Sequence, residues 1–248
     1  MHQQIITGMK LDFENLDIGR GGRTEITSDE LDPVLMTEVM KMITDENGLV
    51  KPVPYDSVKD VGKGNLNIIM QTMGLYTFPT AEVVEFLRGE IDDGDPDYAP
   101  DAIEICAGTG WIGRNLDIPI TDSHLQERED IMKAYISNNC MPIKYPKDVE
   151  KMDAITAIKH YEPEFVIGSY VTRKWGIGSK KVGSIYGVDT SWVVNNCHKF
   201  FLIGNENVHG GDPIMKRKHE TYAPEWLITR GNTEKARIWV WENKLWNN

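Results

Sequence analysis

Residues 102–113, AIEICAGTGWIG, constrain the fold more than any other stretch of the chain. An apolar run leads straight into a turn with two closely spaced glycines, Gly108 and Gly110, and a short helical pattern follows. A β-strand that ends on a glycine turn and passes directly into a helix is typical of a parallel sheet in an α/β protein. The next apolar stretch, IPITD, ends on Asp122 and predicts a second strand.

The remaining chain repeats this alternation of strand and helix, and such alternation favours a mostly parallel sheet with helices on both faces. Two β-rich runs around Gly231-Asn232 in the tail EWLITRGNTEKARIWVWEN predict a C-terminal antiparallel hairpin. Residues 49–70, with Pro52, Pro54 and Gly64, are predicted to be a loop. We predict strands at 102–105, 118–122, 142–145, 164–171 and 198–208, and helices at 27–48, 79–91, 111–116, 123–139 and 147–161.

Composition and targeting signals indicate where such a protein works. The chain has 248 residues, and its first segment lacks the basic start and apolar block of a signal peptide. No apolar stretch approaches the roughly 20 residues of a membrane span. We therefore expect a soluble, cytoplasmic protein with no membrane partner. Three cysteines without a C-x-x-C pair predict neither a disulfide framework nor a zinc site, so no metal is expected.

The net charge of −11 is unevenly distributed. Residues 1–104 hold 21 acidic and 8 basic residues, whereas the remainder is nearly balanced. Clusters of basic residues usually form a solvated face, but they can also attract anionic ligands. Two basic clusters are prominent, and they comprise Arg173, Lys174, Lys180 and Lys181, then Lys216, Arg217 and Lys218.

The segment Gly108–Gly113 is a literal G-x-G-x-x-G, which is usually interpreted as a dinucleotide-binding turn. A dinucleotide site also needs an acidic residue about 20 residues further on, to bind the ribose. Here Asp122 follows Gly108 by only 14 residues, and Glu104 stands in the strand before the turn. The spacing therefore disfavours NAD, although an NAD(P)-linked oxidoreductase remains an alternative.

The pattern Glu104-x-Cys106-x-Gly108-x-Gly110 resembles motif I of the class I S-adenosylmethionine-dependent methyltransferases, with Cys106 at the first glycine. The resemblance implies a three-layer Rossmann-like methyltransferase fold over residues 74–248, with an antiparallel hairpin at its end. Residues 1–73 would then form a partly helical N-terminal extension. The segment around Thr80 is similar to motif X of adenine-N6 methyltransferases, which helps to hold the cofactor. The implied S-adenosylmethionine site comprises Glu104, Cys106, Ala107, Gly108, Gly110, Asp122, Ser123 and Thr80.

The acceptor is expected over the ends of the fourth and fifth strands. Ser169, Tyr170 and His209 are the catalytic candidates there, although the fourth strand ends in Ile-Gly-Ser-Tyr and lacks an Asn/Asp-Pro-Pro-Tyr motif. Cationic loops beside this site favour an anionic acceptor, such as a nucleotide or nucleic acid. The candidate acceptor-binding residues are Arg173, Lys174, Lys180, Lys181, Lys216 and Arg217. A binding protein that kept the fold but lost catalysis is a further alternative, and the sequence leaves the oligomeric state open.

Overall fold

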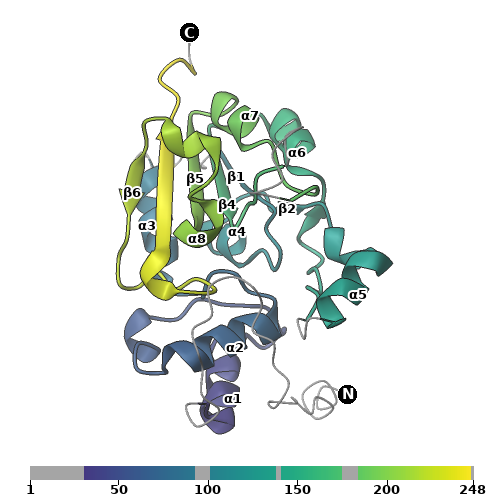
Figure 1. Cartoon of the computed structure of the whole chain (residues 1–248), viewed down its shortest axis with the longest axis vertical. Helices are drawn as coiled ribbons and strands as arrows, with labels where there is room; N and C mark the ends of the chain where they lie inside the picture. The colour runs from purple at the N-terminus through teal and green to yellow at the C-terminus, as the bar shows by residue number, and fades with distance from the viewer. Residues whose placement is uncertain (1–30, 93–100, 138–140, 175–183, 247–248) are drawn as a thin grey trace.

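The computed structural model describes residues 31–92, 101–137, 141–174 and 184–246, and its centre is a five-stranded sheet (Figure 1). The strand order is β1-β4-β5-β7-β6. β7 runs antiparallel to both of its neighbours, and the other pairings are parallel. The strands are β1 (Ala102–Ile105), β4 (Phe165–Ser169), β5 (Lys199–Asn205), β6 (Glu220–Tyr222) and β7 (Ala236–Glu242).

A second, two-stranded parallel sheet lies beside β1. It consists of β2 (Thr121–Asp122) and β3 (Glu150–Lys151). The Glu104 amide donates to the carbonyl of Pro119 at 2.9 Å, and Glu104 forms a parallel bridge with Ile120. The carboxyl ends of β1 and β2 are therefore held side by side.

Helices cover both faces of the central sheet. Successive side chains of a strand point to opposite faces, and here both sets are apolar and are buried under helices. Ile167 and Phe201 pack into the core under α3 (Ala81–Ile91) and α4 (Trp111–Leu116). Val166 and Phe200 point to the other face, under α6 (Ala154–Tyr161) and α7 (Thr190–Asn195). The predicted α/β class with a mostly parallel sheet is confirmed.

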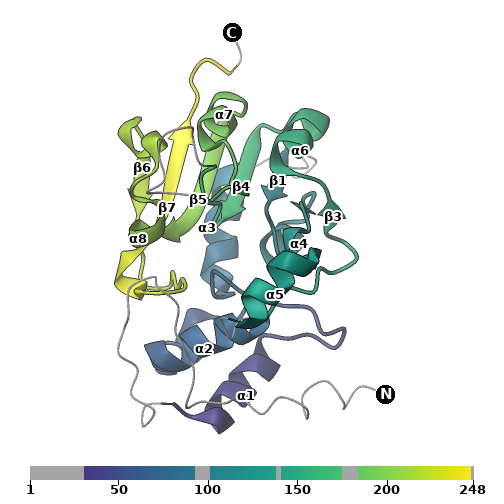
Figure 2. The same cartoon turned by 45° about the vertical axis from the view of Figure 1, so that its right-hand side comes forward.

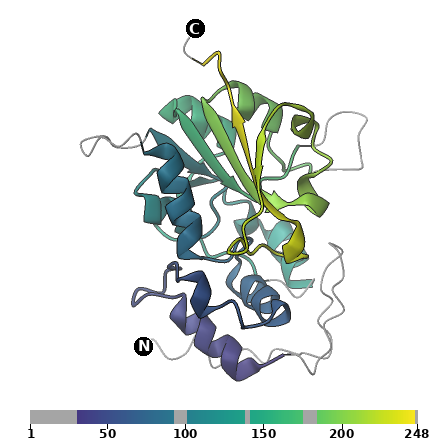
Figure 3. The same cartoon turned by 90° about the vertical axis from the view of Figure 1, so that its left-hand side faces the viewer.

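The helices α1 (Pro33–Met42) and α2 (Lys63–Met73) lie below the carboxyl ends of the parallel strands (Figures 1 and 3). Their apolar side chains belong to the same core as α3 and the sheet. Asn67 Oδ1 accepts a hydrogen bond from the Gly231 amide at 3.0 Å. The described part of the expected extension is thus packed onto the C-terminal part of the chain.

The loop predicted at 49–70 is wrong for residues 63–70, because α2 begins at Lys63.

Four further predictions need correction. The third strand is β3 and not residues 142–145, and α6 begins only after its N-cap Asp153, seven residues later than predicted. The antiparallel partner of β7 is β6, at 220–222, and not the run before Gly231. The first helix ends at Met42 and not near Gly48, and its predicted start at Thr27 lies outside the described residues.

The other elements are short, and most lie around the carboxyl ends of the strands. Figure 2 shows α5 projecting near α4, with α2 below it. None of the helices in the described ranges is long and apolar enough to cross a membrane. The remaining elements are α5 (Glu129–Ser137) and α8 (Glu206–His209), and the 3₁₀ turns Tyr55–Ser57, Leu125–Glu127, Pro213–Lys216 and Thr233–Lys235.

Candidate functional site

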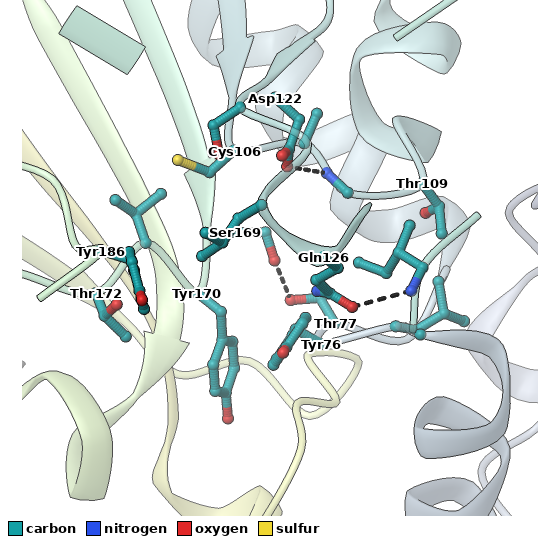
Figure 4. A pocket seen from close by; sticks show the side chains of 18 of the residues that line it. Tyr76, Thr77, Cys106, Thr109, Asp122, Gln126, Ser169, Tyr170, Thr172 and Tyr186 are labelled. Atoms are coloured by element: carbon teal, nitrogen blue, oxygen red, sulfur yellow. Dashed lines mark hydrogen bonds between the residues drawn. The ribbon is translucent and has the colours of Figure 1, made fainter. Parts of the chain in front are cut away.

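A cavity of about 420 Å³ opens at the carboxyl ends of β1, β2 and β4 (Figure 4). This is the end of an α/β sheet at which ligands usually bind, and the volume suits a small organic ligand. Segments that are distant in sequence meet there. The wall comprises residues 74–77, the turn after β1, Asp122, Ser123, Leu125 and Gln126 at the end of β2 and after it, Tyr135 with Ile143 and Tyr145, residues 169–172 after β4, and Ser184 and residues 186–188 with Val208.

The turn after β1 places three alternate residues in the left-handed backbone region. The φ angles are +53° at Cys106, +58° at Gly108 and +67° at Gly110. Glycine adopts this region without steric cost, whereas a residue with a Cβ adopts it rarely. Cys106 therefore has the backbone of a glycine at the position where the motif has one.

The Asp122 carboxylate is buried, at 8% exposure, and it holds this turn in place. Its Oδ2 accepts a hydrogen bond from the Gly108 amide at 3.0 Å, and its Oδ1 accepts one from the His124 amide at 2.8 Å. Each carboxylate oxygen has about two lone-pair sites. These two amides leave one acceptor site on each oxygen, the Tyr145 phenol interacts with the same carboxyl group, and Asp122 lines the cavity.

Glu104 also serves the turn, from the opposite side. Its Oε2 accepts a hydrogen bond from the Gly113 amide, in the first turn of α4, at 2.7 Å. A Cβ on Gly113 would lie 2.8 Å from Ile120 and 3.0 Å from Glu104, so only glycine fits there. Burial raises the pKa of Glu104 to about 8, so the carboxyl is mostly protonated at neutral pH.

Ser169 and Tyr170 stand at the end of β4, on the opposite side of the cavity from Thr109 (Figure 4). The Ser169 hydroxyl lies 2.8 Å from that of Thr77. Tyr170 has a left-handed φ of +57°, and its ring centroid is 5.3 Å from that of Tyr76. Burial raises the pKa of Tyr170 to about 12, so the phenol is neutral at physiological pH.

His209 is not part of the cavity wall. It is 3% exposed, and its Nδ1 accepts from the Asn205 amide at 3.1 Å. Its ring packs edge-on against Tyr170, with centroids 5.1 Å apart. Burial lowers the pKa of His209 to about 4. The imidazole is therefore neutral and lies outside the wall of the cavity, so the geometry does not support its predicted role as a base.

Thr80 is also outside the cavity. It is fully buried, and its hydroxyl donates to the Trp226 carbonyl at 3.2 Å. Thr77, three residues earlier in the chain, lines the cavity instead. Ser123 and Ala107 line the cavity as expected, and Gly110 lies just outside its wall.

The predicted basic residues that the structure describes do not line the cavity. Lys216 and Arg217 come after α8 in the sequence. The Arg217 side chain donates to Asn195 Oδ1 at 2.7 Å. Asn195 ends α7, which leads into the start of β5, so this cluster lies at the opposite end of the sheet. Arg173 and Lys174 adjoin the wall residue Thr172 but are not part of the wall. Lys180 and Lys181 lie outside the described residues.

Several wall residues were not predicted from the sequence. Gln126 Oε1 accepts from the Ile143 amide at 2.9 Å, and the Tyr145 ring stacks on His124 with centroids 4.0 Å apart. Burial, followed by the nearby Asp122 charge, raises the pKa of Tyr145. No local pattern marks such residues, because they meet only in the folded chain. The tyrosines of the wall are Tyr76, Tyr135, Tyr145, Tyr170 and Tyr186.

Within the described residues, no group of His, Cys, Asp and Glu side chains is arranged to hold a metal ion. Comparisons with protein-family models, with curated proteins and with solved structures gave no match.

Proposed function

We propose that the chain is an S-adenosylmethionine-dependent methyltransferase. The observation that carries this proposal is the use of the amide groups around the glycine turn. The amides of Gly108 and Gly113 already donate to the carboxyl groups of Asp122 and Glu104. A pyrophosphate needs free N–H groups at such a turn, and it is repelled by a carboxylate. The turn therefore favours a ligand without phosphate over NAD.

The residues present fit the proposed cofactor. Asp122, at the end of β2, would accept hydrogen bonds from the ribose hydroxyls, and the backbone from Cys106 to Gly108 would lie along the methionine part, as the resemblance implies. In the described wall, Asp122 is a carboxylate and no Lys or Arg side chain is present. Such a wall is electrostatically suited to a sulfonium cation.

The sheet gives independent support. The resemblance implied an antiparallel hairpin at the end of a mostly parallel sheet, and β7 runs antiparallel between β5 and β6. A purely parallel dinucleotide-binding sheet does not require this strand. The glycine-like backbone of Cys106 also agrees with the motif, because its left-handed φ is what the first glycine of the pattern would provide.

When bound, S-adenosylmethionine supplies an electrophilic methyl group: the acceptor's lone pair forms the new bond to carbon while the S–CH₃ pair returns to sulfur. The chain's contribution is mainly positioning, which is effective in such in-line displacements. The paired hydroxyls of Ser169 and Thr77 are placed to hydrogen-bond an acceptor. Tyr170 remains protonated and its hydroxyl donates to the Arg230 carbonyl, so it acts as part of the wall and not as a base.

The test is calorimetric titration of the full chain with S-adenosylmethionine, S-adenosylhomocysteine and NAD. We expect the first two to bind, and Asp122→Asn to weaken both by about 10- to 100-fold, because a hydrogen bond to a charged group contributes about 1.5–3 kcal/mol. Asp117→Asn is the matched control, because Asp117 is exposed and has a left-handed φ of +60°, which asparagine also adopts.

Three other results of these titrations would contradict the proposal or its test. Binding of NAD alone would overturn the proposal in favour of an oxidoreductase. Binding of no ligand by a folded wild-type protein would also overturn it, and would favour a protein that keeps the fold without the cofactor. Equal losses in Asp117→Asn and Asp122→Asn would show that the effect is not specific to the cavity.

A further inference from the structure

The half of the cavity next to β4 is uncharged. Its wall combines hydroxyl groups with aromatic and aliphatic side chains, and Figure 4 shows Thr172 and Tyr186 on the same side as Tyr170. The only carboxyl groups in the described wall, Glu104 and Asp122, belong to the half around the glycine turn. The described residues of this uncharged half are Tyr76, Thr77, Ser169–Thr172, Ser184, Tyr186–Val188 and Val208.

The segment that carries Tyr186 is firmly attached. The Lys174 amide donates to the Val188 carbonyl at 2.8 Å, and the Ser184 amide donates to the Arg173 carbonyl at 2.9 Å. A Cβ on Gly187 would lie 2.3 Å from the Arg173 carbonyl oxygen, so the two backbones approach as closely as glycine allows. Tyr186 is therefore presented from a rigid platform, which is what a binding residue requires.

The Tyr186 ring is held but not covered. The Arg128 guanidinium carbon lies over the ring, 5.1 Å from its centroid. The side chain is nevertheless 41% exposed, although it lines the cavity. Val208, on the same wall, is 36% exposed. An aromatic surface fixed by a cation on one face and open toward a cavity is suited to stacking a flat ligand.

Two cations near this half, Arg230 and Arg128, have other partners. The Arg230 guanidinium lies 4.1 Å from the Tyr76 ring centroid, and it donates to the carbonyls of Leu75 and Met70. Arg128 pairs with Asp130 at 2.8 Å. An anion in this half would lose its hydration and find no cationic side chain in the described wall, which is costly. The phosphate-bearing acceptor expected from the basic clusters does not suit this wall.

We propose that the acceptor group is an uncharged planar heteroaromatic ring, stacked on Tyr186 with its polar edge toward the hydroxyls of Ser169 and Thr77. This inference rests on the proposed methyltransferase function. The ring is accepted free or as a nucleoside, and a phosphate attached to it opposes binding. Basic residues outside the wall, including Lys216 and Arg217, do not contribute to this recognition.

The test uses the full chain saturated with S-adenosylhomocysteine, whose binding is measured first. Two matched pairs of probes are then titrated calorimetrically: cytidine against cytidine monophosphate, and nicotinamide against nicotinate. We expect the neutral member of at least one pair to bind at least tenfold more tightly than its anion. Tyr186→Leu should weaken that binding by about tenfold, as for the loss of one aromatic stack, whereas Tyr186→Phe should preserve it.

Tyr161→Leu is the control for loss of a tyrosine, because Tyr161 is on α6, outside the cavity, and bonds to Glu150. Tighter or equal binding of the anions, binding that Tyr186→Leu does not change, or binding of none of the neutral probes would each overturn the acceptor proposal. These results would leave the cofactor proposal intact, because S-adenosylhomocysteine would already have bound. Failure of S-adenosylhomocysteine to bind would refute the proposed function itself.

Discussion

Replacement of the buried Glu104 by glutamine tests whether this carboxyl is neutral in the folded protein. The pKa of Glu104 is raised from 4.5 to about 8 by burial. A group whose pKa is raised on folding stabilises the protein fully below its unfolded pKa, and this stabilisation is lost as the pH rises through the folded pKa. The window for Glu104 therefore runs from pH 4.5 to about 8.

The size of the effect follows from about 1.4 kcal/mol for each unit of pKa shift. Between pH 6 and pH 9, wild type should lose about 3 kcal/mol of unfolding free energy at this site. Glutamine keeps an oxygen that accepts from the Gly113 amide, and it does not ionise. The difference in unfolding free energy between wild type and Glu104→Gln should therefore shift by about 3 kcal/mol across this range, in favour of glutamine at high pH.

The assay is urea unfolding followed by circular dichroism at pH 6, 7, 8 and 9. Because other groups titrate in both proteins, only the difference between the two curves is interpreted. The exposed Glu46 provides the control, and Glu46→Gln should differ from wild type by a constant amount. A constant difference for Glu104→Gln as well would mean that Glu104 is ionised throughout, and the argument from burial would be wrong.

Three further predictions concern stability. Gly113→Ala should lower the unfolding free energy by about 1–3 kcal/mol, because the new methyl group would crowd Ile120 and Glu104. Gly89→Ala should raise it by about 0.5–1 kcal/mol, because Gly89 is on a helix and its new methyl group would have no atom within 4 Å. Urea titrations of both variants test these two values. The pKa of His209 is lowered on folding, so its contribution to stability is present above pH 6.5 and about 3 kcal/mol of it is lost as the pH falls to about 4. His209→Gln should remove this part of the loss of stability in acid. An unchanged slope of unfolding free energy against pH would contradict the prediction. Asn67→Ala should cost about 1–3 kcal/mol, because the Gly231 amide loses its acceptor; thermal unfolding without a shift would refute this.

Much of the sheet was predictable because its signals are local. The strand before the glycine turn, the helix at Trp111 and the strand that ends on Asp122 each follow from a few adjacent residues, and the structure has them as predicted. β4 and β5 are apolar runs buried on both faces and were also predicted, although the strand predicted at 198–208 ends at Asn205, where α8 begins. A buried strand needs apolar side chains along its length, so its sequence marks it.

The errors arose where the local signal was absent or misleading. β3 consists of Glu150 and Lys151, which are both exposed, so no apolar pattern marks it. Ile143 and Tyr145 resemble a strand, but they contribute to the cavity wall instead. Gly64 suggested a loop, yet it lies within the first turn of α2, whose packing outweighs the low helix propensity of one glycine.

The site residues also divide into those that a local sequence signal marks and those that only the fold brings together. Gly108 and Asp122 could be found because the turn and the strand end are short-range features. Tyr186 could not, because its position depends on pairing between residues 172–174 and 184–188 and on Arg128 from a distant segment. The location of Lys216 and Arg217 also required the fold, since proximity in sequence to the end of β5 does not fix which end of the sheet they reach.

The attachment of α2 to the C-terminal part of the chain sets an order of events during synthesis. Asn67 bonds to Gly231, 164 positions later, and Lys63 pairs with Glu234, 171 positions later. At 5–20 residues per second, the ribosome takes roughly 8–30 s to add that length of chain. For that time the apolar face of α2 lacks these final partners. Newly made chains are therefore open to aggregation and chaperone capture at α2 until the segment around Gly231 has been made.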